Sequence, residues 1–207
     1  MRTRIKICGL TQVEAALHAA YAGADAIGLV FYPPSPRHVE IAQAREIAQA
    51  LPAFVSSVVL FVDADAAEVQ TVIEQVRPSL LQFHGDESPV YCRQFKLPYI
   101  KAVRVRAGLD LVQYATRFDD AQGILLDAFV PGEAGGTGHS FDWALIPPVL
   151  PLPLILSGGL DAQNVAAAIQ QTRPWAVDVS SGVEISKGIK DAAKVVQFIQ
   201  EVSNAYR

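Results

Sequence analysis

The sequence predicts a closed (β/α)8 barrel (a TIM barrel) that forms a single domain over residues 1–207. Eight short apolar runs alternate along the chain with amphipathic, alanine-rich stretches. The runs are almost continuously apolar, which is typical of parallel strands buried on both faces. No Gly-x-Gly-x-x-Gly motif follows the first run, and this disfavours an open dinucleotide-binding sheet. We therefore expect the closed barrel.

The eight runs are the expected strands, and each is followed by a segment long enough for a helix. A chain of 207 residues lies near the lower limit for such a barrel, so its loops should be short. In chain order the expected strands are Arg4–Cys8, Ala26–Phe31, Ser57–Val62, Leu80–His84, Tyr99–Val103, Gly123–Asp127, Pro153–Ser157 and Trp175–Val179.

Capping residues mark where several of the helices should begin. Thr11 and Glu14 have the spacing of a capping box, and Asp65 with Glu68 repeats that spacing before the third helix. Helices are also expected over residues 40–50 and 190–204, with a short sixth helix over 141–146. Further N-cap candidates are Asp86, Asp110 and Asp161.

Composition narrows the class of protein. The net charge is −4 and no basic run occurs, so we expect no nucleic-acid partner. Cys8 and Cys92 lack metal-site spacing, so neither a metal site nor a disulfide framework is expected. The N-terminus has no secretory apolar region, and no stretch reaches the ~18 apolar residues of a membrane span. We expect a cytoplasmic protein without membrane contact, and a monomer because no exposed apolar helix face is evident.

The functional site is expected at the carboxyl ends of the strands, where barrel enzymes carry their active sites. Gly158 and Gly159 follow the seventh strand, and Ser180, Ser181 and Gly182 follow the eighth. Glycines allow close backbone approach to an anion, and loops seven and eight of barrels often bind phosphate. We interpret these five residues as a phosphate site, although they could also be ordinary tight turns.

Cys8 and Asp127 end the first and sixth strands, roughly opposite each other across the barrel. A thiol and a carboxyl group that face one substrate can act as base and acid. Position alone leaves the alternatives open, because buried cysteines usually pack and strand-end aspartates often cap the next helix.

Three further features of the loops are candidates for substrate contact. Arg37 lies in a proline-rich loop and could bind a substrate carboxylate, or could be a solvated loop arginine. His84 ends the fourth strand and could contact substrate or satisfy the barrel rim. The glycine-rich segment 131–138, which includes Gly136, is interpreted as a mobile cover, with an unstructured surface loop as the alternative.

Taken in order, several motifs spread over essentially the whole chain resemble those of phosphoribosylanthranilate isomerases. They are Lys6-Ile-Cys-Gly-Leu-Thr11, Gly28-Leu-Val-Phe with Ser35-Pro-Arg37, Leu81-Gln-Phe-His-Gly85, Leu126-Asp127, Gly135-Gly-Thr-Gly-His-Ser-Phe-Asp-Trp143, Leu156-Ser-Gly-Gly-Leu160 and Ala176-Val-Asp-Val-Ser-Ser-Gly-Val-Glu184.

This resemblance implies an Amadori rearrangement of N-(5-phosphoribosyl)anthranilate to 1-(2-carboxyphenylamino)-1-deoxyribulose 5-phosphate in tryptophan biosynthesis. It implies Asp127 as the general acid that opens the furanose ring and Cys8 as the general base that removes the C2 proton. Arg37 would hold the substrate carboxylate, the two glycine-containing loops the phosphate, and Asp178 would lie near the sugar. The phosphorylated small molecule is then the only expected partner, and no metal or organic cofactor is needed.

Three alternatives to this function remain, two of them other enzymes and one a non-catalytic protein. A histidine-pathway isomerase of the same fold would have an aspartate where Cys8 stands and would need a second phosphate site. A non-catalytic phosphate-binding barrel would keep the two glycine-containing loops but would have no use for Cys8 and Asp127 together. A metal-dependent pentose-phosphate epimerase would need a His-x-Asp pair near the second strand, where this chain has Pro-Pro-Ser-Pro-Arg.

Overall fold

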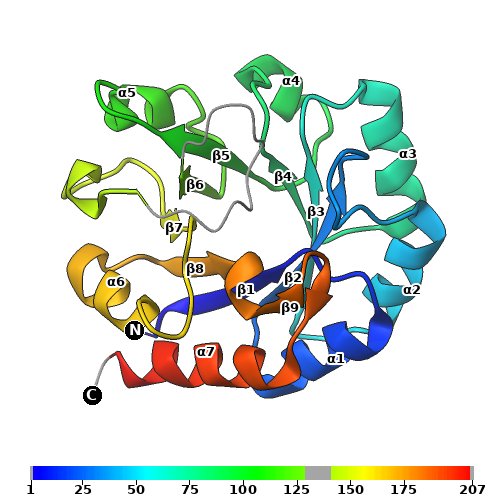
Figure 1. Cartoon of the computed structure of the whole chain (residues 1–207). Coiled ribbons are helices and arrows are strands. Elements are labelled where there is room, and N and C mark those ends of the chain that lie inside the picture. Colours follow the sequence, from blue (N-terminus) through cyan, green and yellow to red (C-terminus); the bar gives the residue numbers. More distant parts are fainter. Residues whose placement is uncertain (1, 129–140, 206–207) are drawn as a thin grey trace.

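The computed structural model describes residues 2–128 and 141–205, and its strands form a closed parallel barrel in the order β1 to β8 (Figure 1). The predicted (β/α)8 fold is therefore confirmed. The barrel strands are β1 (Arg4–Cys8), β2 (Ala26–Phe31), β3 (Ser56–Phe61), β4 (Leu80–Phe83), β5 (Tyr99–Val105), β6 (Gly123–Ala128), β7 (Leu154–Leu156) and β8 (Ala176–Val179). A separate antiparallel pair, β9 (Glu184–Ser186) and β10 (Ile189–Lys190), follows β8.

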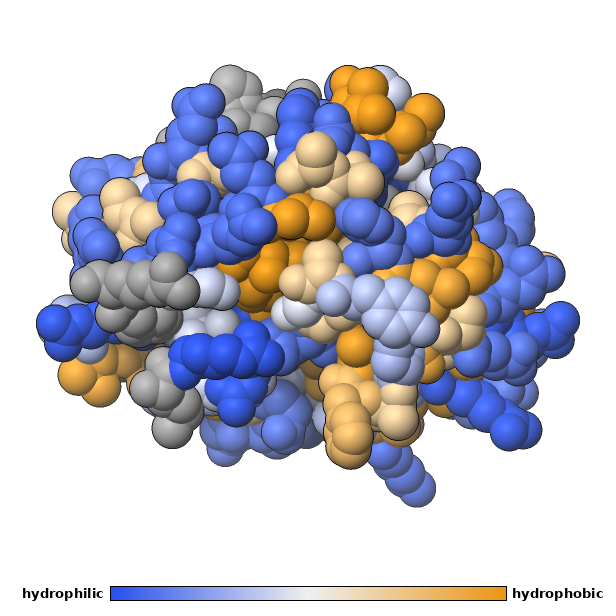
Figure 2. All heavy atoms as spheres, turned by 90° about the horizontal axis from the view of Figure 1, so that it is seen from below, coloured by the Kyte–Doolittle hydropathy of each residue, from blue (hydrophilic) through white to orange (hydrophobic). Residues whose placement is uncertain are grey.

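Helices surround the barrel, and α1 and α7 lie together along its lower edge in Figure 1. Seen from that side, the surface is mostly hydrophilic with separate apolar patches (Figure 2). None of the helices in the described parts of the chain is long and apolar enough to cross a membrane. The helices are α1 (Val13–Ala22), α2 (Ile41–Ala50), α3 (Ala66–Val76), α4 (Pro89–Arg93), α5 (Leu111–Thr116), α6 (Val165–Thr172) and α7 (Ala192–Asn204), with short 3-10 turns η1 (Trp143–Leu145) and η2 (Ser181–Val183).

Alternation along each strand separates the two sides of the barrel wall. On β1, Ile5 and Ile7 belong to the large apolar core under the helices. Lys6 and Cys8 occupy the alternate positions and therefore point into the barrel. The register pairs Cys8 with Gly28 on β2 and Lys6 with Asp178 on β8. Thus β1 and β8 deliver polar groups to one region of the interior, and β2 places a glycine beside them.

The structure corrects several predicted boundaries and caps. The third strand begins one residue early, at Ser56, and β7 is only three residues long. The capping box at Thr11 is wrong: α1 begins after Gln12, and the Thr11 hydroxyl instead donates to the Gly188 carbonyl at 3.2 Å. That contact ties the loop after β1 to the turn between β9 and β10, so tertiary pairing replaces the local cap.

The other predicted caps have mixed outcomes. Asp110 caps α5 by accepting from the Gln113 amide, as predicted. Asp65 occupies the N-cap position of α3, but its side chain makes no capping bond. The prediction of Asp86 is wrong, since Ser88 caps α4. Asp161 caps the turn that precedes α6 rather than the helix itself, whose N-cap residue is Asn164.

Candidate active site

The carboxyl end of β1 places a thiol and an ammonium group over the same glycine. A Cβ atom added to Gly28 would lie 2.7 Å from Cys8 Sγ and 3.1 Å from Lys6 Nζ. No side chain fits there without displacing one of them. Because Cys8 and Gly28 are paired in register, the glycine provides the space in which the two polar groups meet.

Lys6 is held in place by Asp178 of β8. Their Nζ and Oδ1 atoms lie 2.8 Å apart, and both side chains are buried. The Ser157 hydroxyl, at the end of β7, donates to the other Asp178 oxygen at 3.3 Å. Burial alone would lower the pKa of Lys6, but the Asp178 carboxylate outweighs it and raises that pKa. Lys6 is therefore a fixed positive charge next to Cys8.

Burial raises the pKa of the Cys8 thiol above its ordinary value. Lys6 acts in the opposite direction, since its positive charge favours the thiolate, while Asp178 again disfavours the thiolate. Burial therefore favours the thiol form of Cys8, and the cation beside it favours the thiolate.

Asp127 ends β6 with both carboxyl oxygens hydrogen-bonded. Its Oδ1 accepts from the Ala128 amide at 2.8 Å, and its Oδ2 lies 3.0 Å from His84 Nε2. The amide nitrogen of Gln82 lies 2.9 Å from His84 Nδ1 and can only donate. Nδ1 is therefore the acceptor, so the ring proton sits on Nε2 and points at Asp127. The sequence analysis left open whether His84 contacts substrate or only satisfies the barrel rim. In the structure it contacts the candidate acid.

The loops next to His84 are fixed by a second buried ion pair. Lys101 of β5 is fully buried and donates to Glu87 at 3.1 Å and to the Gly85 carbonyl at 2.6 Å. Glu87 also accepts from the Asp63 amide, at 2.9 Å. This cluster joins the loops after β3 and β4. It thereby fixes the end of β4, which His84 directly follows.

Arg37 is buried, so it is not the solvated loop arginine that the sequence analysis gave as the alternative. Its Nε and Nη2 atoms each lie 2.8 Å from an oxygen of Glu184, in a bidentate pair. Glu184 also accepts from Lys190 Nζ at 2.7 Å. Burial would raise the pKa of Glu184, but Arg37 and Lys190 outweigh it and lower that pKa. One edge of the Arg37 guanidinium is thus occupied by Glu184.

Loops seven and eight converge, as the sequence predicted. A Cβ atom on Gly182 would lie 2.0 Å from the Leu160 carbonyl oxygen, so the two loops are in direct contact. Gly158 and Gly159 have positive φ angles of 82° and 63°. No carbonyl of the described residues accepts a hydrogen bond from the amides of Gly159, Ser181 or Gly182. These amides are thus available to an anion.

Two details of these loops were not predicted from the sequence. Neither motif contains a lysine or arginine, but Lys190 Nζ lies 3.0 Å from the Ser180 carbonyl oxygen and 3.3 Å from its hydroxyl. The Ser180 hydroxyl also donates to the Cys8 carbonyl at 3.1 Å. A Cβ atom on Gly158 would lie 3.1 Å from Asp127 Oδ1, so this glycine makes room for the candidate acid.

Sequence reasoning did not assign Lys6, Gln82, Glu184 or Lys190. Lys6 carried a usable signal, because it stands in a strand with apolar neighbours two positions before Cys8 and therefore shares its face. Glu184 and Lys190 lie in β9 and β10, a small sheet that the sequence analysis did not foresee. Gly136 and the segment 131–138 lie outside the described residues. Among the residues that are described, no three His, Cys, Asp or Glu side chains are grouped as a metal site.

Comparison with known proteins places this site in a family. Residues 5–201 match the family model described as N-(5'-phosphoribosyl)anthranilate (PRA) isomerase. An N-(5'-phosphoribosyl)anthranilate isomerase from Nitrosospira multiformis is 58% identical over 202 residues, which cover 98% of this chain and 97% of the relative.

Solved structures of the same kind superpose on the chain. Phosphoribosyl anthranilate isomerase from Thermotoga maritima gives a TM-score of 0.90 at 40% identity, covering 98% of this chain and 99% of the other. A phosphoribosyl anthranilate isomerase in complex with reduced 1-(o-carboxyphenylamino)-1-deoxyribulose 5-phosphate gives 0.87 at 39% identity, with the same coverage.

Proposed function

The chain belongs to the N-(5'-phosphoribosyl)anthranilate isomerase family, and we propose that Cys8 and Asp127 perform the proton transfers of its reaction. It catalyses the isomerisation of N-(5'-phosphoribosyl)anthranilate in tryptophan biosynthesis. The observation that carries the residue assignment is that both groups lie buried at the same end of one barrel, each next to a fixed polar partner.

In the proposed mechanism Asp127, as the general acid, donates a proton to the furanose ring oxygen. The bond between that oxygen and C1 breaks, and the nitrogen lone pair forms an iminium with C1. Cys8, having released its thiol proton to solvent, then removes the C2 proton as the thiolate, and the C–H electrons move into the C1–C2 bond while the C=N electrons return to nitrogen. The resulting enolamine tautomerises to the ketone. Lys6 stabilises the thiolate during this sequence.

Substrate anchoring at two ends would fix C1 and C2 between these groups. The amides of Gly159, Ser181 and Gly182 would bind the phosphate, with Lys190 close to the Ser180 end of the site. Arg37 would bind the anthranilate carboxylate at the edge not used by Glu184. The activity itself is tested by following the fluorescence of the anthranilate substrate as it is consumed. A purified chain without measurable turnover would contradict the function.

The phosphate assignment predicts that Gly159→Asn raises the KM. Asparagine tolerates the positive φ of 63° better than valine, so this variant tests access to the amides with less backbone strain. Losing a charge-assisted hydrogen bond should raise KM about 10–100-fold. The matched control is Gly108→Asn, at φ 84° with open space around it. Steady-state kinetics with an unchanged KM for Gly159→Asn would contradict the assignment.

The carboxylate assignment predicts that Arg37→Lys raises the KM for the anthranilate substrate by about 10–100-fold, because a lysine cannot make a bidentate contact. Binding of a sugar phosphate without a carboxylate should hardly change. Equal losses for both ligands would instead indicate that Arg37 acts through its pair with Glu184. Lysine is preferred to methionine because it keeps a cation beside the buried Glu184.

The charge of Lys6 predicts a pH effect on Cys8. Lys6→Gln removes the charge that favours the thiolate and should raise the pKa of Cys8 further, which moves the ascending limb of the kcat/KM profile to higher pH. An ascending limb that stays in place or moves to lower pH in this variant would contradict the proposed role of Cys8.

Two sequence-based expectations stay proposals: that the enzyme is a monomer and that it works in the cytoplasm. Light scattering coupled to size-exclusion chromatography measures the first, and a dimer mass would overturn it.

A further inference from the structure

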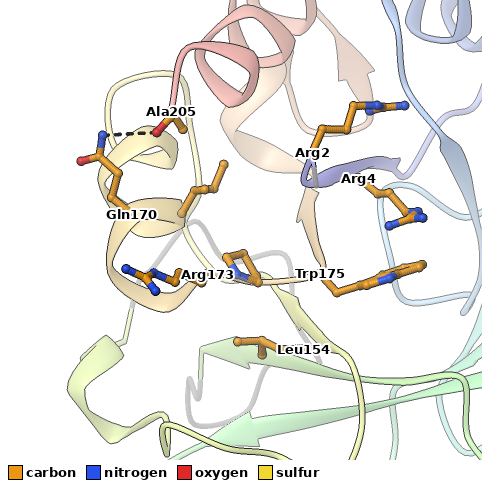
Figure 3. Close-up of a pocket in the computed structure, with 9 residues that line it drawn as sticks. Arg2, Arg4, Leu154, Gln170, Arg173, Trp175 and Ala205 are labelled. Atoms are coloured by element: carbon orange, nitrogen blue, oxygen red, sulfur yellow. Dashed lines mark hydrogen bonds between the residues drawn. The ribbon is translucent and has the colours of Figure 1, made fainter. Parts of the chain in front are cut away.

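A hollow opens at the end of the barrel opposite Cys8 and Asp127, with a volume of about 670 Å³. It is formed where the chain enters β1, β7 and β8, and it is closed on one side by the ends of α6 and α7 (Figure 3). A cavity of this size suits a small organic ligand. The amino-terminal end of barrel strands carries no catalytic groups in barrel enzymes, so its contents call for a separate explanation.

The charged residues that line this hollow are all positive. Its lining contains three arginines, Arg2, Arg4 and Arg173, and no aspartate or glutamate. Arg2 is paired with Asp25, which lies outside the lining. Neither Arg4 nor Arg173 forms an ion pair with a carboxylate of the described residues. Two guanidinium groups without a carboxylate partner among the described residues thus border the hollow from opposite sides, Arg4 beside Trp175 and Arg173 beside α6 (Figure 3).

The same hollow has an apolar wall that includes an exposed aromatic ring. The Arg4 Cζ atom lies 4.3 Å from the centroid of the Trp175 ring, in a cation–π contact, and Trp175 is 43% exposed. Leu154, Ile169 and Pro174 complete the wall. The Arg4 contact holds the guanidinium in a fixed position without neutralising it.

We propose that this hollow binds a small aromatic carboxylate. An apolar wall with few, oriented polar groups is typical of small-molecule sites. The planar fork of an arginine matches a carboxylate, and the apolar residues would cover a ring. This binding goes beyond the isomerase reaction, since neither arginine takes part in the chemistry at the other end of the barrel.

The test uses naphthoate as the probe and isothermal titration calorimetry as the measurement. The active site is first saturated with reduced 1-(o-carboxyphenylamino)-1-deoxyribulose 5-phosphate, whose own binding reports separately on the proposed function. Naphthoate should then bind at one saturable site, and uncharged naphthamide should bind at least about ten-fold more weakly. No binding of naphthoate, or equal binding of the two probes, would overturn the proposal.

Variants locate the binding. The double variant Arg4→Gln and Arg173→Gln should weaken naphthoate binding at least about ten-fold while turnover of the isomerase substrate persists. The matched control is the double variant Arg45→Gln and Arg77→Gln, which also removes two charges, from exposed positions on α2 and at the end of α3, away from the hollow. Unchanged affinity in the double variant, or an equal loss in the control, would show that naphthoate binds elsewhere or through net charge alone.

Discussion

Replacing Cys8 with alanine is expected to lower kcat by about 10²–10⁴-fold, with little change in KM. In the proposed mechanism the thiol would contribute a proton transfer in the transition state and no ground-state anchor, since other groups would bind the carboxylate and phosphate of the substrate. Steady-state kinetics on the substrate fluorescence measures the effect. Near-normal turnover would show that another group removes the C2 proton.

Two further variants sharpen this experiment. Cys8→Ser keeps the size of the side chain but should also be poor, because a hydroxyl is a far weaker base than a thiolate. Cys92→Ala is the matched control, as Cys92 is also fully buried and burial raises its pKa to about 12, but it lies on α4 outside the barrel. This control should lower thermal stability and leave kcat unchanged, the reverse of the result expected for Cys8→Ala.

Replacing Asp127 with asparagine is expected to lower kcat by a similar factor of about 10²–10⁴, because an amide cannot donate the proton that opens the ring. Asparagine has nearly the same shape, so substrate binding should persist. Both Asp127 oxygens accept hydrogen bonds, from Ala128 and His84, whereas an amide has only one oxygen to offer. A modest loss of stability should therefore accompany the loss of turnover, and a melting curve separates the two effects.

The control for this substitution is Asp110→Asn. Asp110 caps α5 from an exposed position, and asparagine is an equally good capping residue. The control should match the wild-type enzyme in both turnover and stability. If Asp127→Asn kept most of its kcat, the acid would have to be another group, and His84, whose Nε2 points at the same position, would be the next to test.

The sequence by itself determined the fold and predicted which groups carry the chemistry. Eight apolar runs without alternation could be buried only as parallel strands with helices outside, and strand ends such as Cys8, Asp127 and the glycines after β7 and β8 were thereby assigned to one end of the barrel. These assignments could be made from the sequence because an apolar run, and the residue at which it ends, are both visible in a few neighbouring residues.

Only the tertiary structure decided which polar groups meet. Arg37 and Glu184 are 147 positions apart, and Lys6 and Asp178 are 172 apart, so no local pattern could pair them. Thr11 shows that a distant partner can also replace a predicted local one. Its hydroxyl donates to the Gly188 carbonyl and does not form the predicted capping box. A buried polar group must find a partner wherever barrel closure brings one, and closure joins the first strand to the last.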